Sequence, residues 1–509
     1  MLTPAGADFL AMPRLRRVLL LTALLAAGAV AAVPAASGAA SSVAVVLGPA
    51  TVLNRYASTP PPASSAQQFV QRTGSTLALG GAPFRFSGTN MYWLALDDNV
   101  RDASGAPTYP TQFRIDDGMA TAQAMGTTVV RAWANTVGCG RCIEPSLGQF
   151  NPDAFASLDY AVASAKAHGV RMELSLVDNW DFYHGSKLTY TRWRGLDEVA
   201  FFTDPTVIAD YQAFITTVLT HVNPVTGVAY KDDPTIMGWE TGNEMWCQSC
   251  SGNPWFPSWT QAVADHIKSV APQQLVIDGH GTDPSCTAQC LDVPSLDIAS
   301  VDVVDDHHYP PSIARVQDSV ALARAHGKAY QVGEYDWRNA RGGDPLPQFL
   351  AAVESSGVAG DLFWAVIPHA DTTGFVDHSD GFEYFYPGRD ADERTRTTQL
   401  VAHAARMSGA TAAGPGPLAA PALQAAWASA QGVQLTWRGV ATAGTYTVQR
   451  SPDGSTWTTV ASGVTDQRAI YGPTTTDTSS GAVGGTQYRV QAVTPDGTGG
   501  AWSAVVTAS

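Results

Sequence analysis

The sequence has few charged side chains, and the basic ones are the scarcer. Asp, Glu, Lys and Arg make up 15% of the 509 residues, with 30 basic against 45 acidic side chains and a formal net charge of −15. Nucleic acid or an anionic membrane surface is therefore not expected as the main partner, because either would require a basic patch. The low charge and the 45% of hydrophobic residues also exclude a largely disordered chain.

Apolar runs long enough to cross a membrane are missing after the N-terminal region. The one candidate, 18–33, follows three arginines within 14–17, is short for a span, and leads into small residues. This order is typical of a secretory signal peptide, with a membrane anchor as the alternative. We predict a signal peptide over 1–40, a flexible lead-in rich in Ala, Ser and Pro over 41–67, and a secreted, extracellular protein without a membrane contact after cleavage.

Cysteine is also scarce, and its six copies stand in three close pairs. The pairs are Cys139 and Cys142, Cys247 and Cys250, and Cys286 and Cys290. In an oxidising compartment such pairs form disulfides, each closing a small ring that fixes the shape of a loop. A zinc site built from the two Cys-x-x-Cys pairs is the alternative.

Short apolar runs alternate with amphipathic stretches through the middle of the chain. Eight runs are typical of buried parallel strands, and they are Phe84–Thr89, Thr128–Trp133, Arg171–Val177, Ile236–Thr241, Leu275–Asp278, Val301–Asp305, Ala329–Gly333 and Asp361–Val366. Helical stretches separate most of them, although the fifth connection has only a short turn near Leu291–Ile298. The pattern predicts a (β/α)8 TIM barrel over 68–408, with an open doubly wound sheet as the alternative.

The last part of the chain has a different pattern. After an Ala-, Gly- and Pro-rich linker over 409–421, residues 422–509 contain Thr-, Val- and Tyr-rich runs separated by Pro-Asp-Gly turns. Regular turns and alternating polarity predict a small all-β, immunoglobulin-like sandwich. Trp437 and Tyr488 resemble the core tryptophan and the tyrosine-corner residue of a fibronectin type III module. We expect a spacer, with a weak carbohydrate contact as the alternative.

Polar and aromatic side chains follow most of the predicted strands. In a (β/α)8 barrel these strand ends form the active site. The side chains placed there are Trp93, Arg131, Trp133, Asn243, Glu244, His307, Tyr309, Glu334 and Trp364. Further aromatic candidates for stacking on a sugar ring are Trp180, Trp246 and Trp255.

Two of these residues, Glu244 and Glu334, are carboxylates at the ends of the fourth and seventh strands. Such a pair is typical of glycoside hydrolysis, in which a retaining enzyme holds its two carboxyl groups about 5 Å apart. Hydrogen bonds from Arg131 and Tyr309 favour an ionised nucleophile, whereas burial and a neighbouring negative charge favour a protonated acid.

Several segments together resemble glycoside hydrolase family 5 β-mannanases. They are the opening Phe86–Leu94, the Asn-Glu motif in Trp239–Glu244, the His-x-Tyr-Pro motif in His307–Pro310, the nucleophile motif Gly333–Tyr335, and Trp364 on the eighth strand. A close cysteine pair also follows the Asn-Glu motif in fungal and plant mannanases. The resemblance covers about residues 68 to 407. It departs where Met245 and Trp246 follow Glu244, since the family often has Pro-Arg there.

The resemblance assigns a role to each matched residue. It implies that Glu334 is the nucleophile and that Glu244 is the general acid and then the general base. Asn243 would bind the sugar 2-hydroxyl, and Arg131 and Tyr309 would orient Glu334. The remaining substrate-binding candidates are His307, Trp364, Trp133 and Trp93.

The function implied is that of a secreted, retaining endo-β-1,4-mannanase. Its substrate would be β-mannan, glucomannan or a related plant cell-wall polysaccharide, and we expect a monomer without metal or cofactor. An exo-β-mannosidase or an endo-β-1,4-glucanase is the alternative within the family. Two other classes are a non-catalytic carbohydrate-binding protein on a decayed barrel and a scaffold protein whose sandwich is the active part.

Overall fold

The computed structural model describes residues 68–509 apart from 252–254, 282–285, 287–289, Ser379, 410–413, Pro415 and 467–472. The predicted signal peptide and lead-in lie outside the described residues. Within the described part, no helix combines the length and hydropathy needed to cross a membrane.

Eight parallel strands close into a barrel. In chain order they are β4 (Phe86–Asn90), β7 (Val129–Trp133), β8 (Arg171–Ser175), β9 (Ile236–Glu240), β10 (Leu275–Asp278), β11 (Val303–His308), β12 (Ala329–Tyr335) and β13 (Gly360–Phe363). The pairing of β13 with β4, beginning at Gly360 and Phe86, joins the last strand to the first. This closed order confirms the predicted barrel and excludes the open sheet. Nearly every strand residue is buried, which explains the near-continuous apolar runs.

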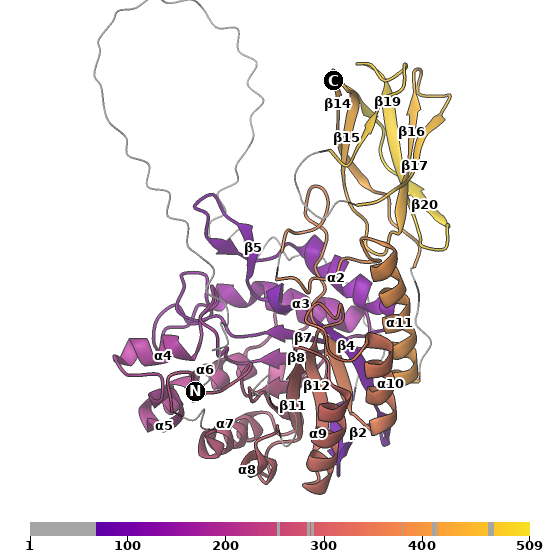
Figure 1. Cartoon of the computed structure of the whole chain (residues 1–509). Coiled ribbons are helices and arrows are strands. Elements are labelled where there is room, and N and C mark those ends of the chain that lie inside the picture. Colours follow the sequence, from indigo (N-terminus) through magenta and orange to yellow (C-terminus); the bar gives the residue numbers. More distant parts are fainter. Residues whose placement is uncertain are drawn as a thin grey trace, which may run out of the picture. The chain divides into compact units, whose positions relative to one another are not determined.

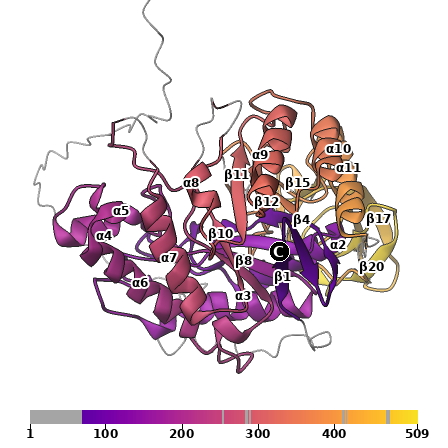
Figure 2. The ribbon, with the colours of Figure 1, turned by 90° about the horizontal axis from the view of Figure 1, so that it is seen from below.

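Helices surround the strands, as Figure 2 shows. The long ones are α2 (Gln112–Met125), α3 (Ala156–Ala167), α6 (Pro205–Thr220), α7 (Pro257–Val270), α9 (Ile313–Ala325), α10 (Leu346–Ser356) and α11 (Ala391–Ser408). The fifth connection holds only the short α8 (Val293–Leu296), as its sequence predicts. Local signals set the helix ends. Thr111 caps α2 by accepting the Arg114 N–H, and Gly126 ends it with a positive φ of 76°.

A small sheet that the sequence did not predict precedes the barrel. It consists of β1 (Val70–Thr73), β2 (Thr76–Leu79) and β3 (Ala82–Phe84). Its Val70 and Leu77 belong to one buried cluster with Val129, Leu275 and Ala329, each the first residue of its strand. The sheet therefore covers the N-terminal end of the barrel. Other unpredicted elements lie in connecting segments, namely η1 (Tyr92–Leu94), β5 (Asp97–Arg101), β6 (Pro107–Thr108), η2 (Pro152–Phe155), α4 (Lys187–Arg194), α5 (Ala200–Thr203) and η3 (Tyr230–Asp232).

The C-terminal residues form antiparallel strands, shown in yellow and light orange in Figure 1. They are β14 (Ala422–Ser429), β15 (Gly432–Arg438), β16 (Thr445–Ser451), β17 (Thr458–Val464), β18 (Thr475–Asp477), β19 (Gln487–Val493), β20 (Gly499–Trp502) and β21 (Val506–Thr507). One sheet has the order β14-β15-β18, and the other has the order β17-β16-β19-β20 with β21 beside β19. Trp437 and Tyr488 are fully buried in one core cluster. An all-β module is therefore present.

Three disulfides join the six cysteines in the local pairs that the sequence indicates. The Cα atoms lie 5.0 Å apart in Cys139–Cys142, 5.4 Å in Cys247–Cys250 and 5.7 Å in Cys286–Cys290. With all six sulfurs bonded in pairs, the zinc alternative is excluded.

His403 of α11 connects three parts of the barrel, and we predict that its loss destabilises the fold. Its Nε2 lies 2.8 Å from buried Asp361 of β13, and its Nδ1 lies 2.7 Å from Glu354 of α10. Burial opposes the charge on His403, but the two carboxylates outweigh it and raise its pKa. His403→Leu leaves Asp361 as an under-compensated buried charge, so we expect a loss of about 3 kcal/mol at pH 6 in chemical denaturation followed by Trp fluorescence.

The pH dependence and a matched variant test the cause. Because the pKa of His403 is raised in the fold, its stabilisation is complete below about pH 6.5 and is lost as pH rises through the folded-state pKa. The gap between wild type and His403→Leu should therefore narrow at alkaline pH. Arg406→Leu removes a half-exposed partner of the same Glu354 and should cost under about 1 kcal/mol. Equal losses in both variants would contradict the assignment.

Candidate active site

The C-terminal ends of the strands bring most of the predicted site residues into one cluster. A bulge in the pairing of β11 with β12 helps to form it, because the register shifts between Asp306 and His307. The shift sets His307 directly beside Glu334, whereas Asp306 pairs with Val332. Bulges of this kind redirect side chains next to functional sites.

Arg131 of β7 holds the centre of the cluster and is fully buried. Its Nη1 donates to Glu334 Oε1 at 2.8 Å and to Asn90 Oδ1 at 3.0 Å. Its Nε and Nη2 donate to the two oxygens of Glu240 at 3.0 and 2.8 Å, and Nη2 also donates to Asn243 Oδ1 at 2.7 Å. One guanidinium therefore orients two carboxylates and two amides. Glu240 thus lies in the buried polar layer beneath the site.

Glu334 is 6% exposed and is held from two sides. Its Oε1 accepts from Arg131, and its Oε2 accepts from the Tyr309 hydroxyl at 3.0 Å. Burial raises the pKa of Glu334 to about 7, against the opposing effects of His307 and Arg131. At neutral pH this carboxylate is therefore close to its titration midpoint.

Glu244 follows β9 in a left-handed backbone conformation, with a φ of 52°. Its Oε1 lies 2.9 Å from His307 Nδ1, and its Oε2 accepts from the Trp180 indole N–H. Burial opposes its ionisation, but these contacts outweigh burial and lower the pKa of Glu244. Burial also opposes the charge on His307, yet the surrounding carboxylates raise the pKa of His307 well above its usual value.

These pKa directions are the reverse of those expected from the sequence for a nucleophile and an acid. Burial acts to raise the pKa of both carboxyls, and they differ in how strongly the charge on His307 opposes burial, since its Nδ1 lies 2.9 Å from Glu244 and 3.6 Å from Glu334. A protonated imidazole at the shorter distance stabilises the carboxylate form of Glu244 more strongly. The raised pKa of His307 and the lowered pKa of Glu244 therefore favour a proton on His307 over one on Glu244.

An aromatic group lies beside the carboxylates. The partly exposed Trp364 follows β13, and its ring stacks on Tyr92 with centroids 5.3 Å apart. Trp133 lies 5.8 Å from the same ring. Asp380 accepts a hydrogen bond from the Trp364 indole N–H at 2.6 Å. These contacts fix the position of a flat side chain at the edge of the cluster.

Trp93 requires a correction, because the structure places it in the core. It is 1% exposed, donates to the Val366 carbonyl at 2.9 Å and packs over Gly118. A residue so covered cannot contact a substrate, so the predicted binding role of Trp93 is wrong. The preceding residue, Tyr92, contacts Trp364 instead.

Some residues of the cluster have roles that the sequence did not reveal. Trp180 was expected as a stacking candidate, but its indole N–H binds Glu244. Asp305 faces His307 Nε2 at 3.5 Å. Asp305 and His307 lie two residues apart on β11, and Tyr309 follows directly after its end. This spacing was the available signal, since alternate side chains of a strand share a face. His308 points away, is fully buried and binds the Tyr330 hydroxyl, as a core histidine would.

Two sets of side chains bring possible metal-ligand atoms within 4.8 Å of one another. They are Glu240, Asp305 and His307, and Glu244, His307 and Glu334. The glutamates in both sets already bind Arg131, Tyr309, Trp180 or His307. We therefore assign these sets to charge and proton chemistry and make no metal assignment.

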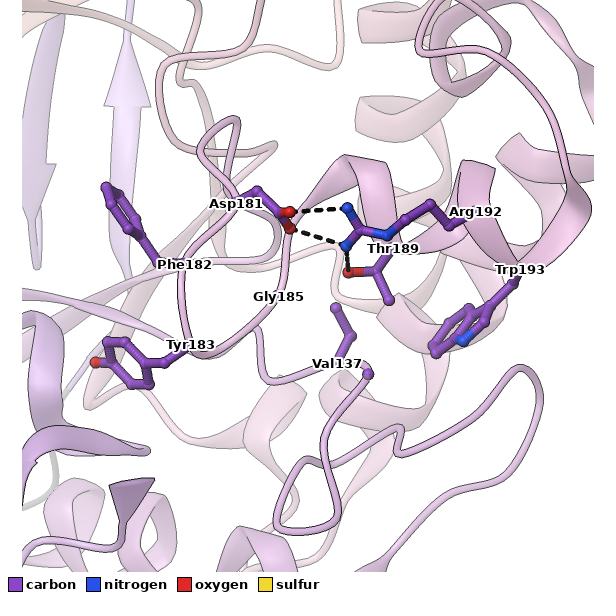
Figure 3. Close-up of a pocket in the computed structure, with 9 residues that line it drawn as sticks. Val137, Asp181, Phe182, Tyr183, Gly185, Thr189, Arg192 and Trp193 are labelled. Carbon is purple, nitrogen blue, oxygen red and sulfur yellow. Dashed lines mark hydrogen bonds and ion pairs between the residues drawn. The ribbon is translucent and has the colours of Figure 1, made fainter. Parts of the chain in front are cut away.

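A separate cavity of about 300 Å³ lies beside the loop that follows β8, and Figure 3 shows its lining. Phe182, which is 61% exposed, is one of the lining residues. Asp181 and Arg192 also line the cavity, and the Asp181 carboxylate accepts two hydrogen bonds from Arg192 at 2.7 and 2.9 Å. Neither Glu244 nor Glu334 lines this cavity. The cavity therefore does not contain the reactive pair.

Comparison with known proteins gives the family. The model for glycoside hydrolase family 5 β-mannosidase-like proteins matches residues 67–307. Mannan endo-1,4-β-mannosidase 8 of Oryza sativa subsp. japonica is 35% identical over 270 residues, which cover 48% of this chain and 70% of that protein. Putative mannan endo-1,4-β-mannosidase 9 of the same organism is 31% identical over 392 residues, covering 67% and 90%. The chain belongs to glycoside hydrolase family 5.

The family makes this protein a glycoside hydrolase of the mannanase-like kind. Its fold agrees with that of the endo-1,4-β-mannanase from Rhizomucor miehei, with a TM-score of 0.56 and 24% identity over 67% of this chain and 100% of that chain. The endo-1,4-β-D-mannanase from Thermotoga petrophila gives a TM-score of 0.53 at 24% identity, covering 62% and 99%. At these identities the two structures support the barrel fold alone.

Arg131→Lys tests whether the hydrolase requires the forked guanidinium. Lys keeps the charge, but a single ammonium cannot satisfy Glu240 and Glu334 in two directions. We expect kcat to fall about 100-fold or more on any substrate that wild type turns over. Arg315→Lys is the matched control, because Arg315 is also buried and binds a carboxylate, that of Asp306, away from the cluster. A similar fall in both variants would indicate a general packing defect.

Proposed function

We propose that this protein is a retaining endo-β-1,4-mannanase in which Glu334 is the nucleophile and Glu244 is the general acid and base. The observation that carries the proposal is the short separation of the two carboxylates. Oxygen atoms of Glu244 and Glu334 lie within 4.8 Å of each other, with His307 Nδ1 between them. Retaining enzymes keep their carboxyl groups about 5 Å apart, whereas inverting enzymes need about 6.5–9.5 Å to admit a water.

The reaction follows from this geometry in two displacements. Glu334 attacks the anomeric carbon, so that a carbon–oxygen bond to the enzyme forms as the glycosidic bond breaks. Glu244 gives its proton to the departing sugar oxygen. Glu244 then takes a proton from water, which attacks the same carbon and releases Glu334.

The neighbouring residues support these roles. Arg131 and Tyr309 bind one oxygen of Glu334 each and so fix its direction of attack. Asn243 is held by Arg131 and donates to Asp178 at 3.0 Å, which leaves its second amide hydrogen for the sugar 2-hydroxyl. Trp364 supplies a flat apolar face for the reacting sugar.

Mannan is proposed as the substrate because the relatives are named for it.

Secretion is proposed from the basic-then-apolar order of residues 14–33 and from the three disulfides. N-terminal sequencing of protein from the culture medium tests it. A start upstream of the apolar run, or retention of the protein in the cells, would contradict export with cleavage.

For the C-terminal part, we propose a fibronectin type III-like domain over 422–509, joined to the catalytic domain over 68–408 by the linker 409–421. Two antiparallel sheets around Trp437 and Tyr488 support this proposal. The Tyr488 hydroxyl donates to Asp477 at 3.0 Å. As a spacer, the domain would not contribute to cleavage. Loss of activity on soluble oligosaccharides in a chain ending at residue 408 would contradict that role.

Product analysis tests the proposed function. Linear mannan, glucomannan and carboxymethyl-cellulose are incubated with wild type and with Glu334→Gln, which removes the nucleophilic charge at nearly constant shape. We expect a ladder of mannose oligomers from mannan with wild type and none with the variant. Mannose alone would indicate exo action, and activity confined to cellulose would overturn the substrate.

Glu244→Ala tests the acid role of Glu244 separately from the nucleophile role of Glu334. A sugar leaving group needs a proton, so we expect the variant to lose at least about 100-fold in kcat on mannan oligomers. The leaving group of an activated aryl glycoside departs without that proton. The glycosyl-enzyme should therefore still form, and its formation should release a burst of phenol. Azide should then accelerate turnover by replacing the activated water. An equal loss on both substrates would contradict the acid role of Glu244.

A further inference from the structure

We propose that Asp305 is a positioning residue that selects the tautomer of His307 and thereby allows His307 to supply the acid proton to Glu244. This inference rests on the proposed function of Glu244 and Glu334. It begins from a carboxylate that the double-displacement mechanism does not use, directly beneath the reactive pair.

The placement of Asp305 is specific. Its Oδ1 accepts the backbone N–H of Asp306 at 2.7 Å, which fixes the carboxylate plane. Its Oδ2 is buried, accepts no hydrogen bond within the described residues, and faces His307 Nε2 at 3.5 Å. Gly333 makes room for it, because a Cβ there would lie 2.0 Å from Oδ2. The residue before Glu334 is thus shaped to admit this carboxylate.

His307 therefore lies between two acceptors on opposite sides of its ring. Nδ1 faces Glu244 at 2.9 Å, and Nε2 faces Asp305. The protonated ring carries one N–H on each nitrogen: the Nδ1–H donates to Glu244, and the Nε2–H faces Asp305 Oδ2. The neutral ring has one N–H, and its neighbours decide which nitrogen keeps it. Once Glu244 carries the proton, its O–H needs Nδ1 as an acceptor, so the ring N–H belongs on Nε2, facing Asp305. With Asp305 at Nε2, the neutral ring keeps the Nε2 proton and releases the one on Nδ1.

The consequence for catalysis is a balanced proton transfer. The Nδ1–H bond of His307 breaks and an O–H bond forms on Glu244, which leaves a neutral imidazole and a carboxylic acid. Without Asp305, a neutral His307 would instead keep its Nδ1 proton and donate to an ionised Glu244, which has no proton to give. Asp305 thus converts the hydrogen bond between His307 and Glu244 into a source of acid.

Other charged groups surround His307 and act on the same equilibrium. Glu240 and Glu244 face it from β9 and the segment after it, Glu334 faces it from β12, and Arg131 on β7 is the nearby permanent cation. Burial lowers the pKa of the neighbouring His308 to about 4, so His308 adds no opposing charge near neutral pH. Behind Asp305, burial raises the pKa of Asp278 on β10 to about 8, and burial also raises the pKa of Glu173 on β8 well above its usual value. Burial thus disfavours the charged form of both outer carboxyls, whereas Asp305 is the carboxyl that faces Nε2 directly, at 3.5 Å.

Asp305→Asn tests the proposal, because it keeps the shape and removes the charge. An opposite charge at this distance shifts a pKa by about 1 unit or more, so the alkaline limb of kcat/KM on mannan oligomers should move to lower pH by about that amount. On the falling side of that limb, kcat/KM on the oligomers should be about tenfold lower than in wild type, in line with one pKa unit. Burst formation from an activated aryl mannoside should be unchanged within about twofold, since that step needs no acid.

The matched control is Asp306→Asn, the same change at the next position. Asp306 points to the other face of β11 and binds Arg315, so this variant should lose thermal stability and keep the wild-type alkaline limb. Coincident pH profiles for the two variants, or equal losses on oligomers and aryl mannoside in Asp305→Asn, would overturn the role of Asp305. A wild-type protein without activity on any mannoside would instead overturn the proposed function. Nitrogen-15 NMR of the His307 imidazole gives an independent measure of the tautomer. The tautomer should change in Asp305→Asn and stay as in wild type in Asp306→Asn.

Discussion

The buried guanidinium of Arg131 is the constraint on which the site depends. Glu240 and Glu334 approach the same region of a barrel interior without access to bulk water, where two unpaired carboxylates would be strongly destabilising. A planar cation with several N–H groups can bind both at once, and two amides as well. The direction of Glu334 and the orientation of Asn243 both follow from the position of this one side chain.

His307 is the second cation of the cluster, and it differs from Arg131 in that it can lose its proton. Arg131 stays charged throughout any reaction, so it fixes geometry without taking part in proton transfer. The imidazole lies within 3.6 Å of both Glu244 and Glu334, so its charge state acts on the ionisation of each. This division between a permanent and a removable charge accounts for the pKa directions of Glu244 and Glu334, which burial alone would have made similar.

The sequence predicts the barrel because its signals are local and repeated. The eight buried strands and the helices between them can each be predicted from the spacing of apolar residues within one segment. The glutamates could be placed from the rule that strand ends form the site. The environment of each residue could not be predicted in the same way, because it depends on side chains distant in the chain. Trp180 and Glu244 are 64 residues apart, and only the closed barrel shows that the indole N–H binds Glu244. Trp93 was misplaced for a related reason, since adjacent residues beyond a strand end take different directions, and Tyr92 took the one toward Trp364.

The two ends of the barrel differ in polarity. The β1-β2-β3 sheet covers the first residues of the strands with apolar side chains, so this end of the barrel is closed to water. The barrel interior between that sheet and the site holds Arg131, Glu240, Glu173 and Asp305, groups whose burial opposes folding. Such a layer is tolerated where it is fixed by cations and by protonated partners, and it gives the reactive carboxylates surroundings that need little reorganisation when charge develops. Glu334 shows the result: burial brings its pKa to about 7, and the contacts from Arg131 and Tyr309 that keep it ionisable are the ones that aim it.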